Sequence, residues 1–281
     1  MSQFEIMPAI MPKSFEEIAE KSEKVYRSVK TIHLDVMDGT LSHPRSWPFS
    51  PPALEEFQKI ASGEIPLPHW KEVDYEVDVM MKNPEDSFAE WVNAGFHRVI
   101  VHIESTEKFI SILHEWKGVV EIGAAINIDT PVSELSRVIH DGVDFVQLMG
   151  IGEIGFQGTP FDDRVIEKVA SLREEYPELI ISVDGGVSLE NAPLLIKAGA
   201  NRLVAGSAIF SIKNHEVAHT PAPSSSEDNL YIIEDITEID KAATTSVEGA
   251  ISSFKDIARK TAVSATLAKG PIDIKLTSEK K

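Results

Sequence analysis

Short apolar segments rich in β-branched residues alternate with segments of helical periodicity along this chain. Eight β-type segments occur before residue 212, from FEIMPAI at 4–10 to NRLVAGSAIF at 201–210, and a helical pattern follows each of the first seven. Repeated βα units predict a parallel sheet, and eight of them predict an α/β fold of the closed (β/α)8 type, a TIM barrel. A doubly wound open sheet is the alternative, but it usually has fewer strands.

The composition changes after the last β-type segment. A stretch rich in Pro, Ser and acidic residues follows, which is typical of an exposed insertion or linker. A helical pattern with Val247, Ile251, Phe254 and Ile257 on one side comes next, and we expect it to be the displaced eighth helix of the barrel. The predicted division is therefore a barrel core at 1–212, an insertion at 213–245, a closing helix at 246–262 and a tail at 263–281.

Charge and composition exclude several classes of protein. The formal net charge is −18, which repels nucleic-acid phosphates and anionic lipids, and the absence of cysteine excludes disulfides and thiolate metal sites. No apolar run approaches the roughly 20 residues that span a bilayer, and the N-terminus lacks the pattern of a secretory signal. We expect a cytoplasmic protein that binds neither nucleic acid nor membrane; a homo-oligomer is left open.

Polar side chains gather at the ends of the predicted strands. In TIHLDVMDG at 31–39, His33 and Asp35 are two residues apart and share one face of a strand. Other candidates stand late in later strands: Asp78, His102, Glu104 and Asp184. The active site of a (β/α)8 barrel lies at the C-terminal ends of its strands, so these groups predict a divalent-metal site with nitrogen and oxygen ligands. Taken singly, each residue has the alternative of an ordinary solvated side chain.

Glycines follow the last three predicted strands. Such barrels commonly bind phosphate with the loops after strands 7 and 8, where glycine lets backbone N–H groups approach an anion. The candidate phosphate-binding residues are Gly155, Gly158, Gly185, Gly186, Gly206 and Ser207. Glycine-rich turns also occur for purely steric reasons.

Six motifs in this order resemble the ribulose-phosphate 3-epimerase family: HLDVMDG, VDVMMKNPED, VHIEST, GFQGTPF, VDGGV and AGSAIF. The resemblance covers roughly residues 4 to 212. It implies a barrel of the ribulose-phosphate-binding type that interconverts ribulose 5-phosphate and xylulose 5-phosphate with a divalent metal, which would be Mn²⁺, Mg²⁺, Zn²⁺ or Fe²⁺.

The resemblance also implies roles for individual residues. Inverting a carbon next to a carbonyl needs two acid/base groups on opposite faces, which would be Asp35 and Asp184, acting through an enediolate. The implied metal ligands are His33, Asp35, Asp78 and Asp184. Three methionines match those that pack over the reacting carbons, with core filling as the alternative: Met37, Met80 and Met149.

The chain departs from the family pattern on the sugar side of the site. Asp78 stands where the family has a histidine ligand, and Ala9 stands where it has a serine that meets a substrate hydroxyl. Either three acids and one imidazole hold a harder ion such as Mn²⁺ or Mg²⁺, or the metal is lost. The sequence therefore predicts phosphosugar binding more firmly than the substrate. Another phosphosugar isomerase or lyase and a non-catalytic phosphosugar-binding barrel are the alternatives, although LDVMDG lacks the lysine that related decarboxylases carry.

Overall fold

The computed structural model describes residues 4–49, 53–156, 158–211 and 246–268. Eight parallel strands close into a barrel in which each strand pairs with the next and β8 pairs with β1. The strands are β1 (Glu5–Ile10), β2 (Thr31–Met37), β3 (Asp74–Met80), β4 (Arg98–His102), β5 (Glu121–Ile126), β6 (Phe145–Met149), β7 (Ile181–Asp184) and β8 (Arg202–Ala205). The predicted (β/α)8 fold is confirmed.

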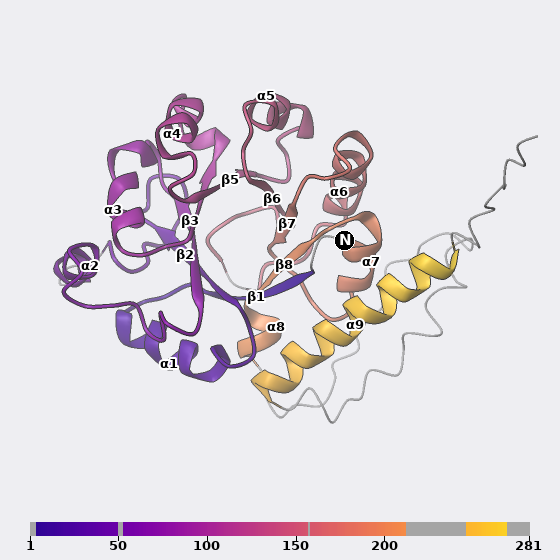
Figure 1. Ribbon diagram of the computed structural model, residues 1–281, viewed down its shortest axis with the longest axis horizontal. Helices are drawn as coiled ribbons and strands as arrows, with labels where there is room; N and C mark the ends of the chain where they lie inside the picture. The colour runs from indigo at the N-terminus through magenta and orange to yellow at the C-terminus, as the bar shows by residue number, and fades with distance from the viewer. Residues whose placement is uncertain (1–3, 50–52, 157, 212–245, 269–281) are drawn as a thin grey trace, which may run out of the picture.

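The helices surround the barrel, which occupies the centre of Figure 1. They are α1 (Phe15–Val25), α2 (Ala53–Ala61), α3 (Phe88–Asn93), α4 (Phe109–Trp116), α5 (Ser136–His140), α6 (Arg164–Glu175), α7 (Ala192–Ala198), α8 (Ser207–Phe210) and α9 (Val247–Ala268). Three short 3₁₀ helices lie in the connections from β3 to α3, from β4 to α4 and from β5 to α5, at Pro84–Asp86, Ile103–Ser105 and Val132–Leu135. In the described part of the chain, none of the helices is both long and apolar enough to cross a membrane.

Local sequence explains where several helices begin and end. Ser14 caps α1, because its side chain accepts a hydrogen bond from the backbone N–H of Glu17. Gly199 ends α7 in the left-handed conformation, with φ of +118°, which residues with a Cβ rarely adopt. These signals fix the length of each βα unit and so the position at which the next strand begins.

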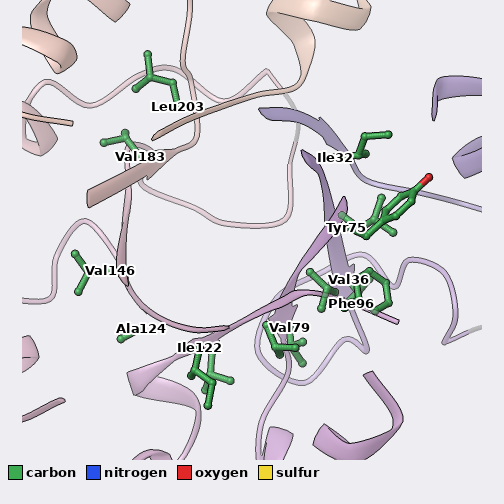
Figure 2. Close-up of a cluster of buried hydrophobic side chains, with 14 of the residues drawn as sticks. Ile32, Val36, Tyr75, Val79, Phe96, Ile122, Ala124, Val146, Val183 and Leu203 are labelled. Atoms are coloured by element: carbon green, nitrogen blue, oxygen red, sulfur yellow. The ribbon is translucent and has the colours of Figure 1, made fainter. Parts of the chain in front are cut away.

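The main core lies between the barrel and its helices. Outward-facing strand residues such as Ile32, Val36 and Val183 are fully buried there, and Figure 2 shows them around the outside of the strands. Alternate residues of the same strands point into the barrel. This alternation divides β2 into an apolar outer face and an inner face that carries His33 and Asp35.

The C-terminal helix α9 packs beside α7, α8 and α1, along the lower right of Figure 1. It buries Ile251, Phe254 and Ile257, as the periodicity predicts, and it runs beyond the predicted end at 262. The insertion at 213–245 and the residues after 268 lie outside the described residues. The division of the chain into core, insertion, closing helix and tail stays a prediction.

The last β-type segment, NRLVAGSAIF, is shorter as a strand than its sequence predicts. Strand β8 ends at Ala205, and Ser207–Phe210 form the single turn α8. Apolar residues continue through both elements, so hydrophobic composition gave no sign of the change. Gly206 lies between the two elements, and a glycine at this point in the sequence is the signal that the strand ends there.

Candidate active site

The register of the barrel brings the predicted polar residues together at the C-terminal ends of the strands. Asp35 of β2 lies opposite Asp78 of β3, and Met149 of β6 lies opposite Asp184 of β7. His33 lies one layer lower in β2, opposite Glu76. Because neighbouring strands are parallel, residues that end them share the same mouth of the barrel.

Four side chains form one buried cluster: His33, Asp35, Asp78 and Asp184. One ligand atom from each lies within 4.8 Å of the others. This is the complete set that the sequence implied as metal ligands. Carboxylate oxygens and an imidazole nitrogen suit Mn²⁺, Mg²⁺ or another divalent cation.

Both ring nitrogens of His33 have acidic partners. Nδ1 lies 2.7 Å from Glu76 Oε1, and Nε2 lies 3.2 Å from Asp35 Oδ1. Burial by itself would lower the pKa of His33, but the hydrogen bonds to Asp35 and Glu76 outweigh it and raise that pKa well above its ordinary value. Burial would likewise raise the pKa of Glu76, and the contact with His33 overcomes this and lowers it.

Asp78 is held by two buried donors. Gln147 donates from Nε2 to Asp78 Oδ2 at 2.8 Å, and His102 Nε2 lies 3.4 Å from the same Oδ2 in a hydrogen bond and 3.3 Å from Oδ1 without one. Burial opposes protonation of His102, but the charge of Asp78 prevails and raises the pKa of the imidazole. Asp78 Oδ1 accepts no hydrogen bond among the described residues, although it is fully buried. A buried carboxylate oxygen without a hydrogen bond is costly, and a cation in the cluster would satisfy it.

Asp184 is in the environment expected of a proton-transfer group. Burial, followed by the negative charges of Asp35 and Asp78, raises the pKa of the Asp184 carboxyl well above its ordinary value. Carboxyl groups with pKa values displaced toward neutrality are typical of acid/base sites.

A cavity opens above the cluster. Among the predicted residues, Asp35 and Asp184 contribute to its wall together with Met80 and Met149. All six predicted phosphate-site residues also line it, namely Gly155, Gly158, Gly185, Gly186, Gly206 and Ser207. His33 and Asp78 are completely buried and absent from the wall. Met37 lies outside the cavity lining, with its sulfur against Gly155.

Two of these glycines are required by the backbone. Gly155 has φ of +96°, and a Cβ there would come within 2.6 Å of the His43 carbonyl oxygen. Gly186 has φ of +68°, and a Cβ there would come within 2.9 Å of Phe161 Cα. Both positions combine a left-handed conformation with close backbone approach. Glycine is therefore required at both for steric reasons, whether or not phosphate binds.

Some polar residues near the strand ends lie outside the cluster. Glu104 Oε1 accepts hydrogen bonds from Asn127 N and Thr130 Oγ1, so this acid anchors the loop after β5 and is not a member of the cluster. Asp38 accepts from the backbone N–H and hydroxyl of Thr40, so this acid shapes the turn after β2.

Sequence reasoning missed two members of this region, Glu76 and Gln147. Each stands two residues before a recognised position, Asp78 and Met149 respectively, and so shares its inward face. Because residues two apart in a strand share a face, this spacing could have identified Glu76 and Gln147 as inward-facing residues.

Solved structures with the same architecture support the fold. The chain is similar to KGPDC from Streptococcus mutans, with a TM-score of 0.61, 12% identity and coverage of 92% of this chain and 98% of that one. It is also similar to 3-hexulose-6-phosphate synthase from Salmonella typhimurium, with a TM-score of 0.58, 13% identity and coverage of 92% and 99%. At such identities these similarities establish the barrel alone.

Sequence relatives are more specific. The chain is 32% identical over 223 residues to the ribulose-phosphate 3-epimerase of Candida glabrata, covering 75% of this chain and 88% of the relative. It is 31% identical over 222 residues to that of Bacillus subtilis, covering 76% and 95%. The model of the ribulose-phosphate 3 epimerase family matches residues 5–210, which contain the whole barrel. The chain therefore belongs to the ribulose-phosphate 3-epimerase family of isomerases.

Proposed function

We propose that the chain is a metal-dependent epimerase that interconverts ribulose 5-phosphate and xylulose 5-phosphate or a closely similar pair of ketose phosphates. The observation that carries this proposal is the presence of two buried carboxylates, Asp35 and Asp184, in the wall of one cavity. They come from β2 and β7, which lie on different sides of the barrel mouth (Figure 1). Family membership supports the same chemistry.

Epimerisation next to a carbonyl needs two proton transfers. One carboxylate removes the C3 proton from one face of the substrate, which leaves an enediolate, and a second carboxyl group returns a proton to the other face. The raised pKa of Asp184 means that this carboxyl holds a proton more readily than an ordinary aspartate, which fits a proton-transfer group. We assign the two roles to Asp35 and Asp184, which exchange them in the reverse reaction.

Four residues would hold the divalent ion: His33, Asp35, Asp78 and Asp184. Their fit rests on the buried Asp78 Oδ1, which lacks a hydrogen bond among the described residues, and on three neighbouring carboxylates that need positive charge. Three acids and one imidazole favour Mn²⁺ or Mg²⁺ over Zn²⁺. When bound, the ion supplies Lewis acidity that stabilises negative charge on the substrate oxygens.

The remaining wall of the cavity suits a sugar phosphate. We infer that backbone N–H groups at Gly155, Gly158, Gly185, Gly186, Gly206 and Ser207 bind the phosphate. Met80 and Met149 present apolar surface beside the carboxylates and would pack against the reacting carbons. Met37 supports this wall from behind Gly155, since it does not line the cavity.

Solvent deuterium exchange at C3 of ribulose 5-phosphate tests the proposal. The protein with Mn²⁺ should exchange this proton, and Asp184→Asn should abolish exchange while the far-ultraviolet circular dichroism stays unchanged. Asp38→Asn is the matched control, because Asp38 belongs to the same motif as Asp35 but, within the described part of the chain, forms hydrogen bonds to Thr40 alone. This variant should retain exchange.

The same experiment separates the alternatives. Absence of exchange across several ketose phosphates would contradict the epimerase and favour a non-catalytic binding barrel or another isomerase or lyase. Near-normal exchange by Asp184→Asn would remove the two-base assignment alone. A cytoplasmic location and a homo-oligomer stay predictions; the names of relatives include a chloroplastic and a cytoplasmic enzyme.

A further inference from the structure

We propose that Glu76 is a positioning residue that fixes the tautomer and ring orientation of His33, so that Nε2 faces the metal cluster. The inference rests on the metal site of the proposed function. It concerns a residue that does not contribute to the cavity wall and so does not touch substrate.

The hydrogen bond between Glu76 and His33 determines which ring nitrogen carries a proton. Glu76 Oε1 lies 2.7 Å from His33 Nδ1, and both side chains are fully buried. An ionised carboxylate can only accept, so Nδ1 must donate. A cation bound in the cluster requires the ring to give up its other proton, and the lone pair is then on Nε2, the nitrogen that lies 3.2 Å from Asp35 Oδ1 on the side of the cluster.

A partly buried arginine, Arg98, and a buried one, Arg202, keep Glu76 ionised and in place. Arg98 Nη1 lies 3.7 Å from Glu76 Oε2, and Arg98 also forms ion pairs with Glu5 and Glu121. Arg202 pairs with the same two acids and stacks over the ring of Phe145. A buried carboxylate needs such compensation. The N-terminal end of the barrel interior therefore supplies the charge that anchors Glu76.

The strand register makes this arrangement a property of the barrel. His33 and Glu76 are paired residues of β2 and β3, one layer below the paired Asp35 and Asp78. The lower pair can thus orient a ligand without entering the site. Residues that hold a histidine ligand through its second nitrogen typically change metal affinity by 10- to 100-fold when they are replaced.

Replacing Glu76 with glutamine tests the inference by calorimetric titration with Mn²⁺. Glu76→Gln removes the charge, and its amide can offer either an oxygen or an NH₂ group to Nδ1, so the tautomer is no longer fixed. We expect the Mn²⁺ dissociation constant to rise about 10-fold or more. The Mn²⁺ concentration for half-maximal C3 exchange should rise equally, whereas exchange at saturating Mn²⁺ should recover.

Glu121→Gln is the matched control. Glu121 contacts the same two arginines, with Arg98 Nε at 3.0 Å and Arg202 Nη2 at 3.5 Å, but it has no contact with His33. Its Mn²⁺ affinity should stay within about twofold of the wild type, a change far below the range for residues that hold a ligand. A purely structural effect on the arginine network would weaken metal binding in both variants.

A direct measurement covers the case in which Glu76→Gln does not fold. Long-range ¹H–¹⁵N spectra of the wild-type protein loaded with Mg²⁺ should show His33 protonated on Nδ1 and unprotonated on Nε2. The opposite tautomer overturns the inference, and so does a folded Glu76→Gln protein with unchanged Mn²⁺ affinity. If the wild type binds no divalent ion, the metal site of the proposed function fails together with it.

Discussion

Asp78 places a third carboxylate in a cluster that otherwise contains one imidazole and two acids. At a residue this deeply buried, negative charge is tolerated only with nearby donors or cations. Gln147 and His102 supply two donors, and both contact Asp78 from strands on the far side of β3 from Asp35. They leave Oδ1 without a hydrogen bond among the described residues. The interior around Asp78 therefore accommodates an acid at this position.

Asp78→Asn should separate metal binding from folding. Without metal the variant should be at least as stable as the wild type, because removing one of three clustered charges relieves repulsion. With Mn²⁺ at about 100 times the wild-type dissociation constant, the metal adds about 2.7 kcal/mol to the free energy of unfolding, and a tenfold loss of affinity would remove about 1.3 kcal/mol. Urea unfolding with EDTA and with Mn²⁺ measures both quantities. An unchanged response to Mn²⁺ would show that Asp78 is not a ligand.

A rule that needs one strand at a time placed the residues of the cluster at the mouth of the barrel, whereas the choice of four metal ligands came from the resemblance to the family. His33 and Asp35 are two residues apart, and Asp184 ends an apolar run, so each could be placed at the mouth without its neighbours. Glu76 and Gln147 matter through partners on adjacent strands, His33 and Asp78. Those contacts depend on the register between neighbouring strands and on the direction of each side chain. The alternation of residues within a single strand predicts neither of these.

At the scale of the elements, Tyr75 joins β3 to α1. Its side chain is buried, its hydroxyl donates to the Pro68 carbonyl oxygen at 2.8 Å, and Ser22 Oγ lies 2.8 Å from the Tyr75 phenol oxygen. Burial raises the pKa of this phenol, and the hydrogen bond with Ser22 offsets the rise only in part. The hydrogen bond to the Pro68 carbonyl therefore requires the neutral hydroxyl, because a phenolate cannot donate.

Stability should fall in alkali because of Tyr75. Its pKa is higher in the folded than in the unfolded protein, so its contribution is complete below the unfolded value of about 10 and is lost as pH rises above it, by up to about 1.4 kcal/mol per pH unit. Tyr75→Phe should cost about 1 to 2 kcal/mol at pH 8 by leaving the Pro68 and Ser22 groups unpaired. Its deficit should shrink between pH 9.5 and 11 in urea unfolding. Parallel curves for the two proteins would contradict this assignment.

Helix α9 depends on its buried face for attachment to the barrel. Phe254 is completely buried where α9 packs on α7, α8 and α1. Phe254→Ala should lower the free energy of unfolding by about 3 to 5 kcal/mol, through lost burial and the cavity that remains. Ser252→Ala, on the exposed side of the same helix, is the control and should change it by less than about 0.5 kcal/mol. An equally small effect at Phe254 would mean that α9 folds independently of the barrel.

Elements were predictable where periodicity or an apolar run was long, and their ends were not. The strands of a parallel barrel are buried on both sides, so they appear in the sequence as nearly continuous apolar runs. For the same reason the predicted last strand was too long and included α8, since Ala208 and Ile209 continue the apolar run in a helical turn. The end of α9 was placed too early for a related reason, because the apolar period fades before the helix ends at Ala268.

For the whole molecule, the barrel carries its charges in two separate places. Inside, acids and bases pair along an interior column that joins Asp35, His33, Glu76 and Arg98. The chain as a whole has a formal net charge of −18, which those inner pairs do not cancel. Compaction brings the unbalanced surface acids closer together than they are in the unfolded chain, so self-repulsion opposes folding.

Monovalent salt should therefore stabilise the protein. Raising NaCl from about 0.01 to about 0.2 M shortens the Debye length from about 30 Å to below about 8 Å, so repulsion across the surface is screened while the buried pairs are little affected. The melting temperature at pH 8, with EDTA present to remove divalent ions, should rise across this range. The same titration at pH 5 provides the control, because the sequence pI is about 4.9 and little net charge remains to screen. A rise of equal size at both pH values would assign the effect to ion exclusion from the surface, and a fall at pH 8 would show that attractive surface pairs outweigh the net charge.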